Sequence, residues 1–194
     1  MSPQAALKTS IPSEPVIEAA HMLYTLEVSL VSGPMSEAFV EENPEVSRTI
    51  QIRGDQTLED LHDVIFTAFD REDDNMYEFR LGNGPHDPEG RYYVLPSELS
   101  GKSSKRKMIA GDVTKTRIAT LGLKPADVFT YWFDFSDDWM HRVTVVSIEE
   151  KTVQGKYPRT IGRVGESPSQ YEEFDGEDTD EEEYAEEEEW SMMY

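Results

Sequence analysis

The sequence contains no cysteine and no long hydrophobic run. The absence of cysteine excludes disulfide bonds, thiol nucleophiles and cysteine-based zinc sites. No apolar stretch approaches the roughly 20 residues that a membrane-spanning helix needs. The first 20 residues carry scattered Ser, Pro and Glu instead of the charged start and apolar centre of a signal peptide. We therefore expect a soluble, cytoplasmic protein with no membrane partner.

Positive charge is missing from the C-terminal part of the chain. The 194 residues include 18 Lys and Arg against 40 Asp and Glu, for a net charge of −22. From Val164 to Tyr194 there is no Lys or Arg, and 14 residues are Asp or Glu. The rest of the chain is only mildly acidic. Binding to duplex nucleic acid needs a basic face, so we do not expect nucleic acid to bind the acidic body.

Composition divides the chain into three parts. Residues 1–20 hold three prolines and little apolar periodicity, which predicts a flexible arm. Residues 167–194 form a run of like charges that repels itself and buries little apolar surface, so we predict a disordered acidic tail. Residues 21–166 are enough for a single α+β domain with one core. We expect this domain to be a monomer.

Apolar periodicity predicts the elements of the domain. Alternation at period two indicates strands over residues 24–30, 48–53, 77–81 and 91–95, and a hairpin of 129–135 with 140–149 around a turn at 136–138. Thr57 and Asp60 form a variant of the capping box that begins a helix over Leu58–Phe69. The order favours an α+β fold: a β-grasp-like mixed sheet with one main helix packed across it, an irregular loop region over 82–117 and a C-terminal β-hairpin.

The hairpin carries a recognisable signature. Residues 129–141 read FTYWFDFSDDWMH and resemble an aromatic-Asp-Phe-Gly-Asp-x-Trp-x-His motif of the family named after the third open reading frame of a root-inducing plasmid. Some members of that family are labelled insertion-sequence passenger or TnpR-like proteins. Three further segments resemble the family in order, namely residues 57–65, 77–79 and 157–171.

The resemblance implies an α+β fold of the β-grasp sort and a possible link to mobile elements, and it implies no activity. Ser136 stands where the family usually has Gly. A Pro-Glu-Asp-Cys-Gly-Gly run that the family carries near its end is missing here, so no role of that run passes to this chain.

Carboxylates and a histidine gather in the hairpin. Asp134, Asp137, Asp138 and His141 are the types of ligand that bind a divalent metal, and His62 or His86 could complete such a site. The alternative is structural. Aspartate in a turn accepts hydrogen bonds from its own backbone, so Asp134 could brace the hairpin and His141 could be a hydrogen-bonded residue beside Trp139.

Other features point to binding. The aromatic row Phe129, Tyr131, Phe133 and Phe135 is typical of a core face, which leaves Trp132 and Trp139 as candidates for an exposed contact surface. A basic stretch contains Lys102, Lys105, Arg106 and Lys107 and is a weak signal for nucleic acid. The acidic tail is interrupted by aromatic residues and could dock on a basic partner or on the basic stretch itself.

Three functional hypotheses follow. The first is a non-enzymatic binding module with an unidentified protein partner, an accessory protein either of a mobile element or of the general bacterial cytoplasm. It would use a sheet edge, Trp132, Trp139 and the tail. The second is a metal-dependent hydrolase that uses the Asp134, Asp137, Asp138 and His141 cluster. The third is a nucleic-acid-handling accessory protein. No cofactor is predicted apart from the divalent metal of the second hypothesis.

Overall fold

Strands make up most of the regular secondary structure in the computed structural model, which describes residues 21–82, 84, 87–99, 109–150 and 154–171. The strands are β1 (Leu23–Ser32), β2 (Ser47–Arg53), β3 (Tyr77–Leu81), β4 (Arg91–Val94), β5 (Ile109–Asp112), β6 (Val128–Phe133), β7 (Trp139–Glu149) and β8 (Arg159–Val164). The helices are α2 (Glu37–Glu42), α3 (Leu58–Ala68), α4 (Pro96–Leu99) and the 3-10 helix η1 (Ile118–Leu121). In this part of the chain, no helix has the length and apolar character to cross a membrane.

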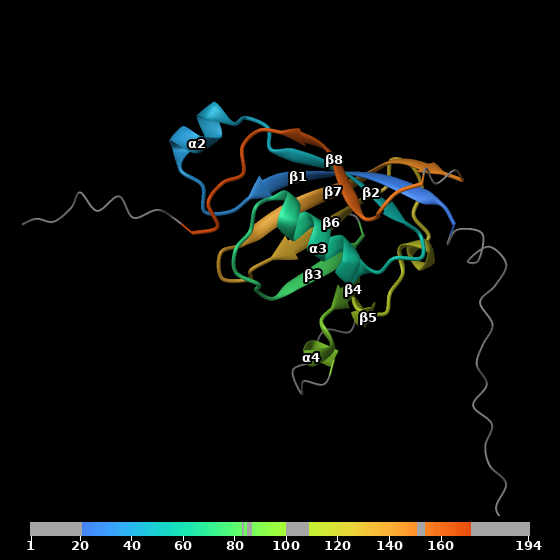
Figure 1. The fold of residues 1–194 in the computed structure, drawn as a ribbon. Coiled ribbons are helices and arrows are strands. Elements are labelled where there is room, and N and C mark those ends of the chain that lie inside the picture. Colours follow the sequence, from blue (N-terminus) through green and yellow to red (C-terminus); the bar gives the residue numbers. More distant parts are fainter. Residues whose placement is uncertain (1–20, 83, 85–86, 100–108, 151–153, 172–194) are drawn as a thin grey trace, which may run out of the picture.

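All eight strands belong to one sheet, in the order β5-β4-β3-β6-β7-β1-β2-β8 (Figure 1). Strands β4 and β5 pair parallel and the other neighbours pair antiparallel, so the sheet is mixed. The α+β class and the β6–β7 hairpin are confirmed. The β-grasp arrangement is not confirmed, since β6 and β7 lie between β1 and β3.

The sequence pattern missed four short elements: α2, α4, β5 and β8. Strand β8 forms one edge of the sheet and shifts register between its pairings with Thr49 and Ile50. Such a bulge breaks the strict alternation by which a strand is recognised in a sequence. The remaining three elements are only four to six residues long, too short for a periodic signal.

Helix α3 lies across one face of the sheet (Figure 1). Its predicted capping box is confirmed: the Thr57 hydroxyl accepts from the Asp60 amide, and the Asp60 carboxylate accepts from the Thr57 amide at 2.7 Å. The buried stripe of the helix is Leu58, Leu61, His62, Ile65 and Ala68. This stripe meets the inward side chains of the strands, among them the predicted core residues Phe129, Tyr131 and Phe133.

The opposite face of the central strands is not covered by a helix in the described part of the chain. Its side chains stand out from alternate positions of β1, β7 and β6. Val31 is 53% exposed and Val128 is 47% exposed, while inward neighbours such as Val28 and Phe129 are almost fully buried. The second face of the sheet is therefore open near Val31 and Val128, as antiparallel strands allow, but it is covered at β3, where the outward Glu78 and Arg80 are buried.

Trp139 does not lie on the surface, which corrects its prediction as a contact residue. Its side chain is fully buried. The Arg71 guanidinium stacks 3.7 Å from the centre of the indole ring, and Gly33 approaches so closely that a Cβ there would clash with the indole. Strand alternation explains the error, since Trp139 shares the inward side of β7 with His141 and Val143.

Ordered packing continues beyond residue 166, where we placed the end of the domain. The buried Arg48 guanidinium donates to the Val164 carbonyl at 2.8 Å and to the Ser167 hydroxyl at 2.8 Å. The Gln170 carboxamide accepts from the Glu72 amide at 2.8 Å. The segment up to Tyr171 is thus fastened beside the end of α3. The predicted arm (1–20) and the rest of the predicted tail (172–194) lie outside the described residues.

Replacement of Gly33 by Ala tests the close packing around Trp139. We expect Gly33→Ala to lower the free energy of unfolding by about 2 kcal/mol or more, because the new methyl group must displace a buried indole that is stacked on Arg71. Urea denaturation followed by tryptophan fluorescence measures this. Gly155→Ala is the control, since its new methyl group would meet only the end of the Arg159 side chain. Equal stability of the two variants would contradict the packing described here.

Candidate functional site

Asp134 holds the hairpin turn together. Its carboxylate accepts from the Ser136 amide at 3.2 Å and from the Asn75 side-chain amide at 2.7 Å. Its carbonyl oxygen accepts from the amides of Asp137 and Asp138. The backbone of Asp134 is left-handed, with φ of 53°, a conformation that Asp tolerates better than most residues. The prediction that Asp134 braces the hairpin is confirmed, and its two carboxylate oxygens are already engaged.

The five residues of the predicted metal centre are not brought together. Asp137 and Asp138 lie in the turn, His141 points into the core from β7, and His62 sits on α3. Among the residues that the structure describes, no group of three or more His, Asp or Glu side chains could hold a metal ion. His86 lies outside the described residues. The arrangement therefore gives the hydrolase hypothesis no metal site in this part of the molecule.

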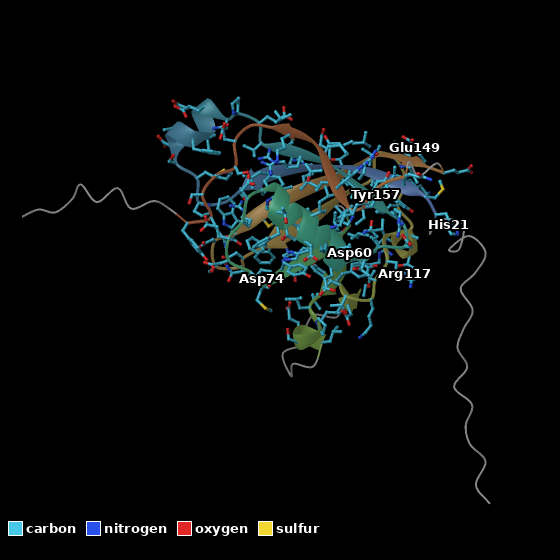
Figure 2. The ribbon with its side chains drawn as sticks, viewed as in Figure 1. His21, Asp60, Asp74, Arg117, Glu149 and Tyr157 are labelled. Atoms are coloured by element: carbon cyan, nitrogen blue, oxygen red, sulfur yellow. The ribbon has the colours of Figure 1, made fainter. Side chains whose placement is uncertain are left out.

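His62 connects a buried phenol to a surface carboxylate. Its Nδ1 lies 2.8 Å from the Tyr131 hydroxyl, and its Nε2 lies 3.6 Å from Asp74. The ring stacks on Tyr77 with centroids 3.7 Å apart. Burial lowers the pKa of His62 to about 4, although Asp74 opposes this shift. Asp74 lies at the surface beside α3 (Figure 2). Since the His62 ring is almost wholly buried, a substrate has no access to its nitrogens.

His141 is one of two fully enclosed titratable groups of the hairpin, together with Tyr131. Its ring lies 4.8 Å from Phe69 and 5.2 Å from Tyr131, measured between centroids, and only 1% of the residue is exposed. Burial, with repulsion from Arg71, lowers the pKa of His141 to about 3. Backbone groups of Trp139 and Tyr131 oppose the shift in part, yet neither ring nitrogen makes a hydrogen bond of normal geometry. His141 is thus a neutral core residue, and the predicted hydrogen bond is not found.

The open face of the sheet contains a hollow of about 850 Å³. We call it the sheet-face hollow. Its floor is formed by Val31 on β1, Val128 and Thr130 on β6, and Met140 and Arg142 on β7. Its walls are formed by Asp87 and Glu89 in the loop before β4, Arg91 at the start of β4, Leu121 at the end of η1, and Leu123 and Asp127 in the loop that follows. A concave site with an apolar lining and few polar groups is the usual form of a ligand site.

Arg142 is the cationic side chain at the centre of the hollow, and a second arginine, Arg91 at the start of β4, lies in its wall. Arg142 pairs with Ser29 on β1 and with Thr130 on β6, so it lies between the two strands that flank β7. It is exposed, and in the described part of the chain its guanidinium makes no hydrogen bond or ion pair. Glu27 on β1 pairs with Thr144, which is two residues from Arg142 on β7, and no ion pair joins Glu27 to Arg142. A free guanidinium offers five N–H donors in a fork that matches a carboxylate.

The walls carry the opposite charge. Asp87, Glu89 and Asp127 line the hollow from the two loops. The Asp127 carboxylate accepts from the Lys124 amide at 2.8 Å, and the Asp87 carboxylate accepts from the Glu89 amide at 2.9 Å. Arg91 is held by a hydrogen bond of 3.1 Å to the Leu121 carbonyl. The hollow thus has a cationic centre on its floor and mostly acidic walls.

Of the two predicted contact residues that the structure describes, Trp132 lies on this face and Trp139 does not. Trp132 is half-buried, with the Arg80 guanidinium 4.1 Å from its ring centre and the Phe135 ring 4.5 Å away. The basic residues Lys102, Lys105, Arg106 and Lys107 lie outside the described residues. The sequence analysis missed Arg142, although its signal was present: Met140, Arg142 and Thr144 alternate with the inward His141, Val143 and Val145.

Comparison with known proteins identifies the family and the fold. A family model described as plasmid pRiA4b ORF-3-like protein matches residues 38–192. A solved structure, a protein of unknown function (MM3350) from Methanosarcina mazei Go1, is 21% identical in sequence with a TM-score of 0.55. The match covers 76% of this chain and 72% of that one, and at this identity it shows the fold alone. No curated protein matches the chain.

Replacement of His141 by Phe tests whether this histidine is only a core residue. We expect His141→Phe to keep the free energy of unfolding at pH 7 within about 1.5 kcal/mol of the wild type, because no hydrogen bond of the ring is lost. The wild-type pKa is about 3 when folded and 6.5 when unfolded. The unfolded chain therefore binds more protons below pH 6.5, and wild-type stability falls as the pH drops through that window.

The variant lacks this contribution. Between pH 6.5 and 4, the slope of its unfolding free energy against pH should therefore be smaller than the wild-type slope, by about 1.4 kcal/mol per pH unit. Urea denaturation at several pH values measures both slopes. His21→Gln is the control, since His21 is exposed. Parallel slopes for His141→Phe and the wild type would contradict a buried neutral His141.

Proposed function

The chain belongs to the plasmid pRiA4b ORF-3-like protein family, and on this premise we propose that it is a non-enzymatic binding module. Its ligand is a segment of a partner protein, which lies in the sheet-face hollow. The plasmid reading frame in the family's name fits an accessory role to a mobile element, and that part of the proposal rests on the name alone.

The observation that carries the proposal is the hollow itself. It lies on the face of the sheet that α3 leaves open, and its volume falls within the range of known ligand sites. Val31 and Val128 expose about half of their surface there, a larger fraction than core-forming strands normally leave to water. Apolar side chains around a polar centre are a common means of recognising peptides.

The distribution of titratable groups supports binding over catalysis. A general acid or base must come within hydrogen-bond distance of its substrate. His62, His141 and Tyr131 have strongly shifted pKa values, but all three side chains are almost fully buried. His141 is among the residues that line the hollow, yet its side chain points inward from β7 and only 1% of the residue is exposed. The three pKa shifts follow from burial in the core and do not require a role in chemistry.

Selection of peptides on the purified full-length protein tests this function. Random peptides about a dozen residues long are displayed, selected for binding, and then synthesised and titrated into ¹⁵N-labelled protein. We expect the selected peptides to shift the amide signals of residues 128–130 and 140–142 and to leave those of β8 (residues 159–164) unchanged.

Two matched variants locate the site. Val128→Asp should weaken binding by about tenfold or more, since a charge then replaces an apolar contact in the hollow. Ile161→Asp should have no effect, because Ile161 is similarly exposed (51% against 47%) but lies on the edge strand β8. Selection of no binding peptide, or of peptides that Val128→Asp binds as well as the wild type does, would contradict the proposed function.

A further inference from the structure

The central position of Arg142 decides which ligand chemistry the hollow favours. The side chain stands on β7, and its registered neighbours on both sides, Ser29 and Thr130, are uncharged. Arginine remains protonated at every physiological pH. Besides Arg91 in its wall, the hollow therefore contains a permanent positive charge that makes no ion pair with any described residue.

The surroundings strengthen the attraction of an anionic group to Arg142. Met140 and Val128 lie on the same face of β7 and β6, so a ligand over the hollow covers Arg142 with apolar groups and excludes water. Charges in such a place interact more strongly than on an open surface. A carboxylate matches the guanidinium in shape and can accept two parallel hydrogen bonds from it.

The walls limit how much negative charge the ligand can carry. Asp87, Glu89 and Asp127 repel additional anionic groups near the loops. Residues 172–194 of this chain contain 13 Asp or Glu and no Lys or Arg, so they are a poor complement to these walls. The charge pattern fits a segment with one carboxylate at its centre and neutral or basic residues on either side.

We infer that the hollow binds a partner-protein segment that places a single Asp or Glu carboxylate on Arg142, between apolar residues that contact Val128 and Met140. This inference rests on the proposed function and adds the chemistry of the ligand. The site differs from the hairpin cluster that the sequence suggested, because it uses the outward side chains of β6 and β7.

A pair of synthetic peptides tests the role of the carboxylate. The first is acetyl-Lys-Val-Glu-Val-Lys-amide, and in the second Gln replaces Glu. Both are titrated into the ¹⁵N-labelled full-length protein, and the Kd is obtained from the amide shifts of residues 130, 140 and 142. We expect the Glu peptide to bind about tenfold more tightly than the Gln peptide.

Three variants assign this preference to Arg142. In Arg142→Gln the two peptides should bind equally. In Arg142→Glu the preference should invert, so that a peptide with Lys in place of the central Glu binds best. Arg53→Gln is the matched control: it removes the same charge from a partly exposed arginine at the end of β2, which pairs with Asp55, and it should keep the full preference for Glu.

The remaining outcomes separate this inference from the proposed function. Equal binding of the Glu and Gln peptides at the hollow overturns the carboxylate inference and leaves the binding module in place. If neither peptide shifts these amides at millimolar concentration, the inference fails, and the display selection then decides the proposed function on its own.

Two further titrations distinguish other occupants. If sodium acetate alone, at the concentration of the peptides, gives the same shifts, then the hollow binds a free carboxylate and the protein-segment inference fails. If added salt shifts the amides of residues 140 and 142 in the peptide-free full-length protein but not in a variant that lacks residues 172–194, the acidic tail of this chain occupies the hollow, and the inference is overturned.

Discussion

A single short helix has to cover a sheet of eight strands, and most features of this fold follow from that mismatch. Eleven residues give α3 a length of about 16 Å, and a helix is about 10 Å wide. Strands lie about 4.8 Å apart, so α3 can cover only two or three of them on one face. The rest of that face is covered by other segments, and the opposite face stays open along the central strands.

Polar side chains complete the covered face where the helix ends. Arg48 is almost fully buried and donates to the Ala68 carbonyl at 2.8 Å, which is one of the last carbonyls of α3. Arg71 stacks on Trp139 and donates to the Pro168 carbonyl at 3.3 Å. These two arginines tie the end of α3 to the segment that follows β8. Burial lowers the pKa of Arg71 to about 10, so its charge persists at neutral pH and stays next to the indole.

The sequence predicted those parts of the fold in which local pattern and packing agree. The capping box of Thr57 and Asp60, the inward alternation of β3 and β6, and the turn centred on Asp134 are each encoded within a few residues. The prediction of Trp139 as an exposed contact residue was wrong, and of the two interpretations of His141 its burial favours the structural one. A residue that follows a turn can face either side, and only the register of β7 against β1 and β6 decides which. The hollow was not predictable, because it joins strands and loops far apart in the chain.

The register of β7 also places the residues of the family signature and the residues of the proposed ligand site on opposite sides of the strand. Asp134, Trp139 and His141 are fixed positions of that signature, and all three serve the interior of the hairpin. Met140 occupies a variable position between Trp139 and His141, and Arg142 comes directly after the signature; both line the hollow. The signature therefore describes the interior of the hairpin, while Met140 and Arg142, which belong to the proposed ligand site, stand at positions that the signature does not specify.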